Sequence, residues 1–218
     1  MEALREKSER KRTKAAGPRA PEERKGAEAT VSDCVFLGKP AVCKRRLPKA
    51  YRIRLLDYKL RSGRTVTEAK ILALAKNAGV KCPLVYFADP VRAEIIEQRL
   101  EGSLLSRLPK AQRNKYARNA GELLAKLHSA GIYHGDYTTT NLMLCADGLQ
   151  VIDFGLAEYS AKSEDFATDV LLYKKSVGKG EFGSFLEGYK EAFPTGYKNT
   201  KASLADIESR GRYVARKQ

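Results

Sequence analysis

The sequence predicts an α+β protein of two lobes, in which a small β-rich N-terminal lobe precedes a mostly helical C-terminal lobe. Apolar residues at strand spacing gather around a single helical pattern between residues 29 and 100, whereas helical spacing dominates after residue 110. A second β-rich stretch, residues 132–158, interrupts the helical half. With 218 residues, the chain is long enough to bury a core in one domain or in two lobes that share a cleft.

Strands and one helix are expected in the N-terminal half. Two apolar runs around the turn signal "GKP" predict a hairpin. Residues 51–64 mix polar and apolar side chains without a clear period, so no element is assigned to them. Apolar residues at helical spacing predict a helix over residues 65–78, with Gly79 as its stop. The predicted strands cover residues 29–37, 41–46, 83–88 and 93–100.

Helices are expected in the C-terminal half. The longest helical pattern covers residues 111–130, where Leu123, Leu124 and Leu127 form an apolar stripe that ends at Gly131. The dipeptide Asp147–Gly148 is typical of a hairpin turn. The other predicted helices cover residues 164–177, residues 182–193 and a final segment from residue 203.

The chain is strongly basic, with a formal charge of +15 and a pI near 9.7. Such a surface attracts polyanions, nucleic acid being the commonest, although solubility alone also explains it. Residues 1–24 are charged and nearly free of apolar residues, which predicts a disordered arm that either touches nucleic acid or only solubilises the chain. The predicted divisions are the arm (1–24), the N-lobe (25–101), the C-lobe (102–207) and a basic C-terminal tail (208–218).

No run approaches the length of about 20 apolar residues that a membrane span requires, and the N-terminus lacks the apolar core of a secretory signal. The four cysteines stand far apart, each beside apolar residues, with no CxxC or Cys/His cluster. They are interpreted as small buried side chains in a reducing compartment. The expected location is therefore the cytoplasm, and also the nucleus, without contact with a membrane.

Residues that bind metal or water concentrate in the β-rich stretch at 132–158. In "HGDYTTTN", Asn141 follows Asp136 by five residues between two apolar runs, so both side chains can lie on one rim. In "VIDFG", a turn at Gly155 can direct Asp153 to the same place. Magnesium prefers hard oxygen ligands. Asn141 and Asp153 are predicted metal ligands, and Asp136 is predicted to lie near a hydroxyl that is activated.

Phosphoryl transfer also requires a cation over the phosphates. Lys44 lies on a predicted strand, and Glu68 on the predicted helix is a suitable anionic partner for it. The alternative for Glu68 is an ordinary exposed helix glutamate. Arg45 and Arg46, next to Lys44, are interpreted as part of a solvated strand face.

Together these motifs resemble the protein-kinase signature set: HxDxxxxN, DFG, a strand lysine and a helix glutamate, in the right order. The chain departs from that set at Gly135, where ordinary protein kinases have an arginine. It has no APE motif after the DFG, and "GAEA" at residues 26–29 stands where a three-glycine phosphate loop is expected.

More specifically, the chain resembles the atypical kinase and ATPase subunit of the KEOPS complex, called PRPK in animals. The resemblance runs from Lys25 to Arg212 and is carried by "GAEA", "KRRLPKAYR", "RTVTEA", "EGS", "HGDYTTTNLML", "IDFGLAE", "EDFATD" and "RGR". It implies a protein-kinase-like two-lobed fold with a reduced C-lobe.

The resemblance also implies a function. The family hydrolyses ATP with Mg2+ in support of threonylcarbamoyladenosine (t6A) modification of tRNA, and the isolated subunit phosphorylates serine and threonine. It implies three partners: the threonylcarbamoyl transferase through the C-lobe and tail, a small helper subunit through the N-lobe, and tRNA within the complex.

By position, the resemblance implies that Lys44 grips the α- and β-phosphates and that Glu68 holds Lys44. Asp136 would orient the attacking water or hydroxyl, Asn141 would take one metal site, and Asp153 would bridge magnesium to the phosphates. Two further groups would contact the nucleotide: Gly26 and Glu28 in the loop over it, and backbone atoms from Glu97 to Leu100 beside the adenine.

Two other classes of function remain open. One is a free-standing kinase, either RIO-like or acting on a small molecule, and the other is a non-catalytic scaffold that keeps a nucleotide pocket. Structural roles are favoured for the remaining polar residues of the motifs. His134 is expected to brace the backbone, His128 to lie in the core, and Asp165 and Asp169 to support a helix start and a loop.

Overall fold

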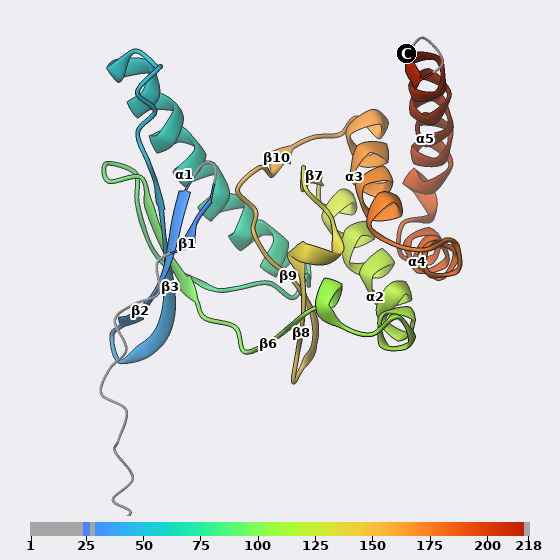
Figure 1. Cartoon of the computed structure of the whole chain (residues 1–218), viewed down its shortest axis with the longest axis horizontal. Coiled ribbons are helices and arrows are strands. Elements are labelled where there is room, and N and C mark those ends of the chain that lie inside the picture. The colour runs from blue at the N-terminus through green and yellow to red at the C-terminus, as the bar shows by residue number, and fades with distance from the viewer. Residues whose placement is uncertain (1–23, 27–28, 216–218) are drawn as a thin grey trace, which may run out of the picture.

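The computed structural model describes residues 24–26 and 29–215, which fold into a small sheet lobe and a larger helical lobe (Figure 1). The predicted α+β class and the two-lobed arrangement are confirmed. The predicted basic arm, apart from Arg24, lies outside the described residues, as do Glu28 and residues 216–218 of the predicted tail.

A five-stranded antiparallel sheet in the order β1-β2-β3-β5-β4 forms the N-lobe. Its strands are β1 (Arg24–Lys25), β2 (Ala29–Phe36), β3 (Lys39–Arg46), β4 (Val85–Asp89) and β5 (Glu94–Gln98). All four predicted strands are present. The hairpin turn consists of Leu37 and Gly38, with φ of 50° and 77°, as a two-residue turn of the primed type requires. Pro40, predicted in the turn, therefore lies inside β3.

Helix α1 (Arg54–Asn77) accompanies the sheet and begins well before the predicted start at residue 65. Its second half buries Ile71 and Leu72, which gives the helical period that the sequence shows. Its first half exposes Leu55 and Leu56. Because these apolar residues face away from the core, they add no core-facing stripe, and the periodicity of the first half is hidden.

Four helices and several short strands form the C-lobe. The helices are α2 (Lys110–Ser129), α3 (Ser163–Ser176), α4 (Lys179–Ala192) and α5 (Pro194–Ala215). The strands are β6 (Gly102–Leu104), β7 (Ile132–Tyr133), β8 (Leu142–Cys145), β9 (Gly148–Val151) and β10 (Glu158–Tyr159), and the 3-10 turns are η1 (Leu105–Arg107) and η2 (Thr139–Asn141). Strands β6, β8 and β9 form one small sheet, and β7 pairs with β10.

All four predicted C-lobe helices are present, but α5 differs at both ends. It starts at Pro194 rather than at residue 203, because proline is well suited to the first turn of a helix. It also continues past residue 208, where the predicted tail begins, to Ala215.

The core of the C-lobe is organised around α2, whose predicted stripe of Leu123, Leu124 and Leu127 is buried. Helices α2 and α4 approach each other closely at two glycines. A Cβ atom on Gly121 would lie 2.0 Å from the carbonyl oxygen of Phe185, and one on Gly188 would lie 2.2 Å from that of Arg118. The two backbones therefore pack against each other without side chains between them.

All four cysteines are free thiols. Only Cys82 is fully buried, so the interpretation of the cysteines as buried side chains is wrong for Cys34, Cys43 and Cys145, which are half-buried. Among the described residues, no helix is both long and apolar enough to cross a bilayer.

We predict that Gly121→Ala lowers the free energy of unfolding by about 1–3 kcal/mol, because the new methyl group overpacks the contact between α2 and α4. Gly183→Ala on α4 is the matched control, since an added Cβ there has no neighbour within 4 Å. It should raise stability by up to about 1 kcal/mol through helix propensity. Urea unfolding checks both values, and equal stability of the two variants contradicts the close contact.

Candidate active site between the two lobes

Lys44 connects the two lobes. It lies on β3, paired in register with Val31 of β2 and Ile95 of β5. Its Nζ donates to Oε1 of Glu68 on α1 at 2.8 Å and to Oδ1 of Asp153, beyond β9, at 2.6 Å. The structure thus brings Lys44 and Glu68 together as expected, so the alternative of an ordinary exposed helix glutamate is wrong: Glu68 is 2% exposed.

The ion pair between the lobes is held in its charged form. Burial alone would lower the pKa of Lys44, but the carboxylates of Glu68 and Asp153 outweigh it and raise this pKa above its usual value. Burial also opposes the charge of Asp153, and the Lys44 ammonium overcomes that effect and lowers the pKa of this carboxyl. Both groups are therefore charged at neutral pH, and each stabilises the other.

The turn after β9 directs Asp153 toward Lys44. Asp153 has φ of 60°, in the left-handed region that non-glycine residues seldom occupy. The N–H of Gly155 donates to Asp153 Oδ1 at 3.2 Å. A Cβ atom on Gly155 would lie 2.9 Å from Lys44 Nζ, so a larger residue would crowd the ammonium. Strained backbone of this kind persists where the surroundings require it, and it clusters at functional sites.

Asp136 and Asn141 form a second pair beside the first. Nδ2 of Asn141 donates to the carbonyl oxygen of Asp136 at 2.8 Å and to its Oδ2 at 2.7 Å. The N–H of Ile152 donates to the carbonyl oxygen of Asn141 at 2.9 Å, which places Asn141 next to the residue that precedes Asp153. The structure therefore brings Asp136 and Asn141 to the same place as Lys44, Glu68 and Asp153, the other residues of the signature set.

The oxygens that remain free suit a magnesium ion. Asn141 uses its amide nitrogen for both bonds to Asp136, and its Oδ1 has no partner among the described residues. Oδ2 of Asp153 has none either, and this side chain is 55% exposed. The described residues contain no group of three His, Cys, Asp or Glu side chains able to hold a metal. One amide and one carboxylate oxygen, completed by substrate and water, are the ligand set that magnesium accepts.

A buried carboxylate on α3 fixes the loop that carries Asp136. Asp169 accepts the backbone N–H of His134 at 2.7 Å and that of Gly135 at 2.9 Å. His134 is itself fully buried, and its Nδ1 accepts the N–H of Asp136 at 3.3 Å. The structural roles expected of Asp169 and His134 are thus confirmed. Asp165 lies in the first turn of α3, as expected, and accepts from the hydroxyl of Ser160 just before the helix.

Gly135 has a physical reason to depart from the arginine of ordinary protein kinases. Its φ is 81°, and a Cβ atom at this position would lie 2.6 Å from the carbonyl oxygen of Leu156. Any side chain at residue 135 would therefore collide with the segment after the DFG motif.

Arg46 was missed by the sequence analysis. It is 4% exposed, and its Nη2 donates to Oε2 of Glu68 at 2.6 Å and to the carbonyl oxygen of Gly155 at 3.4 Å. The interpretation as a solvated strand face is wrong for Arg46 and holds for Arg45, whose side chain is 57% exposed. The signal was the alternation of a strand, because Lys44 and Arg46 share one face of β3.

The residues predicted to contact the nucleotide base and its covering loop lie around the sheet. Gly26 follows β1 and is exposed, and its N–H donates to the carbonyl oxygen of Ala29 at the start of β2, whereas Glu28 lies outside the described residues. Leu100 follows β5 on the connection to the C-lobe, and its N–H has no partner in the described part of the chain.

Glu97 lies near the end of β5, opposite Val42 and Val85. Burial raises the pKa of Glu97 to about 7, and the nearby Glu68 carboxylate adds to this rise while Lys44 partly offsets it. The side chain of Glu97, like its backbone, therefore lies close to Lys44 and Glu68.

Comparison with curated proteins finds relatives over most of the chain, although no known protein-family model matches it. A "Probable bifunctional tRNA threonylcarbamoyladenosine biosynthesis protein" from Methanobrevibacter smithii is 40% identical over 197 residues, which is 87% of this chain and 36% of the relative. The chain thus spans about a third of the length of the bifunctional relatives.

Two relatives match along most of their own length. The "KEOPS complex subunit Bud32" of Pyrococcus abyssi is 37% identical over 80% of this chain and 85% of the relative. A "Probable serine/threonine-protein kinase BUD32 homolog" of Archaeoglobus fulgidus is 39% identical over 80% of this chain and 89% of the relative.

Among solved structures, the Rio2 kinase of Chaetomium thermophilum in complex with ADP/Mg2+-phosphoaspartate has a similar fold. The TM-score is 0.60 at 15% identity, over 87% of this chain and 70% of that one. This likeness confirms the predicted protein-kinase-like fold.

We predict that Arg46→Met lowers the free energy of unfolding by about 3 kcal/mol, because it leaves one oxygen of the buried Glu68 carboxylate without a partner. Arg45→Met is the matched control on the same strand, and the loss of its exposed ion pair with Glu94 should cost less than about 1 kcal/mol. Urea unfolding measures both variants. A variant at Arg46 as stable as the one at Arg45 would show that this arginine does not hold Glu68.

Proposed function

The chain belongs to the Bud32 family, and from this premise we propose that it is an ATP-hydrolysing atypical serine/threonine kinase subunit of a KEOPS complex that supports threonylcarbamoyladenosine modification of tRNA. The Bud32 relatives, matched over more than four fifths of their own length, support the complex and the kinase class. The name of the longer relative supports the tRNA modification.

The single observation that carries the catalytic part of this proposal is the Lys44–Asp153 ion pair between the lobes, with Asp136 and Asn141 beside it. A scaffold would not need a buried ammonium, a strained aspartate and a free amide oxygen at one place. Each of these features has an energetic cost that function explains.

In the proposed reaction, the bond between the γ-phosphorus of ATP and the oxygen that links it to the β-phosphate breaks, while an oxygen of water or of a hydroxyl group bonds to phosphorus. ADP leaves, and the attacking O–H releases its proton to solvent. Lys44 would hold oxygens of the α- and β-phosphates while Glu68 keeps its position. Asp136 would orient the attacking O–H through Oδ1, because its Oδ2 already accepts from Asn141.

Asn141 and Asp153 would hold magnesium through their free oxygens. The bound ion neutralises charge on the phosphates. At the other end of the nucleotide, the N–H of Leu100 would donate to the adenine, with Glu97 beside it, while Gly26 and Glu28 would belong to the covering loop.

We predict that Asp153→Asn reduces magnesium-dependent ATP turnover by a factor on the order of 100 or more, because it removes the charge that would hold the metal. Asp147→Asn, in the exposed turn between β8 and β9, is the control that should keep wild-type turnover. Phosphate release, measured after both variants are shown to be folded, checks this. Wild-type turnover by the Asp153 variant would remove the proposed metal role.

The same assay separates the complex subunit from a free-standing kinase. For a subunit of KEOPS, adding the threonylcarbamoyl transferase and tRNA should raise wild-type turnover and leave the Asp153 variant inactive. Turnover that is indifferent to both additions would favour the free-standing alternative.

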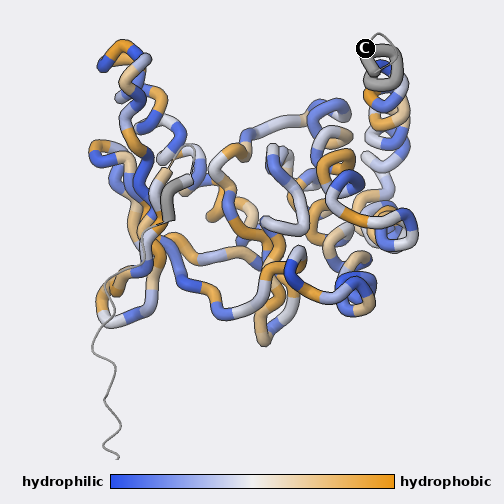
Figure 2. Tube along the Cα trace, in the orientation of Figure 1, coloured by the Kyte–Doolittle hydropathy of each residue, from blue (hydrophilic) through white to orange (hydrophobic). Residues whose placement is uncertain are grey.

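We also propose the three partners. An exposed apolar patch at the outer end of α1 supports a contact of the N-lobe with the small helper subunit. Its members are Tyr51, Ile53, Leu55 and Leu56, which are 78%, 77%, 64% and 51% exposed. Figure 2 shows hydrophobic residues at this outer end. Contiguous apolar residues on a surface mark a protein interface.

The transferase is proposed to bind the C-lobe and tail, and the charge of +15 supports contact with tRNA.

We predict that Leu55→Ser weakens binding of the helper subunit by about 10-fold or more, because it removes a side chain that the interface would bury. Lys59→Ser, an exposed change on the same helix, is the matched control. Calorimetric titration of each variant with the helper subunit measures the effect. Equal affinity of the two variants would place the interface elsewhere.

A further inference from the structure

A chain of buried hydrogen bonds links α5 to the loop that carries Asp136. The hydroxyl of Thr200 on α5 lies 3.4 Å from that of Tyr189 on α4, which lies 2.6 Å from Nδ1 of His128 on α2. Nε2 of His128 lies 3.2 Å from Oδ2 of Asp169. All four side chains of this chain are at most 2% exposed. Asp169 in turn holds the backbone N–H groups of the loop.

All hydrogen bonds of this network can donate in one direction, from Thr200 toward Asp169. Since the carboxylate of Asp169 only accepts, the proton of His128 belongs on Nε2, and Nδ1 accepts from the hydroxyl of Tyr189. The oxygen of Tyr189 can then accept from Thr200. Burial lowers the pKa of His128, so that the ring is neutral at pH 7, as this arrangement requires. Hydrogen bonds aligned in this way strengthen one another.

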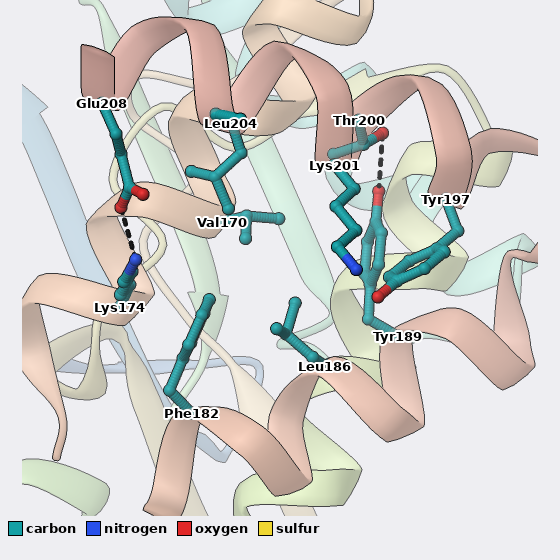
Figure 3. Close-up of a pocket in the computed structure, with 11 residues that line it drawn as sticks. Val170, Lys174, Phe182, Leu186, Tyr189, Tyr197, Thr200, Lys201, Leu204 and Glu208 are labelled. Carbon is teal, nitrogen blue, oxygen red and sulfur yellow. Dashed lines mark hydrogen bonds and ion pairs between the residues drawn. The ribbon is translucent and has the colours of Figure 1, made fainter. Parts of the chain in front are cut away.

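The outer end of this hydrogen-bond network lies in the wall of a cavity between α3, α4 and α5. The cavity has a volume of about 210 Å³, and both Tyr189 and Thr200 line it. Figure 3 shows Val170, Phe182 and Leu186 pointing into the space between the helices. An apolar cavity of about 150 Å³ holds one benzene molecule. This cavity is therefore large enough for one ring with a short substituent.

The charged groups of the cavity leave one cation unmatched. Lys174 and Glu208 pair with each other at 2.5 Å. Lys201 lines the same cavity, is exposed, and forms no ion pair within 4 Å in the described part of the chain. Nζ of Lys201 lies over the ring of Tyr197, 5.8 Å from the ring centre (Figure 3). The net charge of these three groups is +1, which favours an anion.

We propose that this cavity binds a small carboxylic acid with a compact apolar body, and that its occupant stabilises the hydrogen-bond chain that holds the active-site loop. The apolar body would pack on Val170, Leu186 and Leu204, and the carboxylate would accept from Lys201. The site goes beyond the proposed function, because neither the nucleotide nor a partner subunit is needed for it.

The occupant acts on the loop through contact with Thr200 and Tyr189, the first two residues of the hydrogen-bond network. It would pack against the ring of Tyr189 and the side chain of Thr200, which restricts both hydroxyl groups. The effect reaches Asp169 through His128 and shows at the backbone N–H groups of His134 and Gly135.

Binding is tested with phenylacetate, and with the neutral phenylacetamide as the matched ligand, by NMR titration of the full chain. Phenylacetate should bind saturably and shift signals of α3, α4 and α5. Lys201→Met should weaken its binding by about tenfold, the value of one charge-assisted hydrogen bond. Lys198→Met, an exposed change on α5 away from the cavity, should leave the affinity unchanged.

Coupling is tested by amide hydrogen exchange of His134 and Gly135. Phenylacetate should slow the exchange of both amides in the wild-type chain. Thr200→Val keeps the shape of the side chain and removes its hydroxyl group. This variant should bind phenylacetate as the wild type does, while exchange at the loop responds less than in the wild type, because only Tyr189 then transmits the effect to His128.

Binding and coupling can each be overturned. The binding site is excluded if phenylacetate does not bind, if phenylacetamide binds equally well, or if the Lys201 variant keeps full affinity. The coupling is excluded if bound phenylacetate leaves the wild-type exchange unchanged, or if the Thr200 variant responds as the wild type does. Neither readout depends on ATP turnover, so a failure here is distinct from a failure of the proposed function.

Discussion

The burial of the Lys44 ammonium is the constraint on which the arrangement of both lobes depends. Lys44 is 8% exposed, and a cation so placed requires anions within hydrogen-bond reach. The N-lobe supplies Glu68 and the C-lobe supplies Asp153. With Arg46 the group contains two cations and two carboxylates, so its net charge is zero. The position of one lobe relative to the other is thus linked to the neutralisation of a single charge.

The two carboxylates of this group are not equivalent. Glu68 is buried and held by a cation at each oxygen, so its removal would leave Arg46 without a carboxylate partner among the described residues and Lys44 with Asp153 alone. Asp153 is held through one oxygen, and its side chain is 55% exposed. Its pairing with Lys44 is therefore the weaker and more exchangeable one, since solvent screens exposed charges. Anionic phosphates could replace Asp153 at Lys44 without disturbing Glu68.

Sequence reasoning was strongest where a local pattern has one physical cause. Helix α2 was predicted almost to the residue, because its apolar stripe faces the core. Sequence reasoning failed where the cause of a structural feature is not local. The first half of α1 faces solvent and shows no stripe, and the burial of Arg46 depends on Glu68, which is 22 residues away in the chain. The residues of the active site were predicted from their chemistry and from a resemblance in motif order, whereas their distances and the role of Arg46 required the folded chain.

The loop with Asp136 shows why a reduced helical lobe still needs all of its helices. The loop contributes few buried apolar side chains of its own. Its shape therefore depends on Asp169, which lies far from the loop in the sequence. Asp169 is itself positioned by His128 on α2, and His128 by Tyr189 on α4. Each contact is a buried polar bond that is costly to leave unmade. The geometry of the catalytic loop is therefore set by the packing of α2, α3 and α4, and a change at the far side of the C-lobe can reach Asp136 without altering any residue beside it.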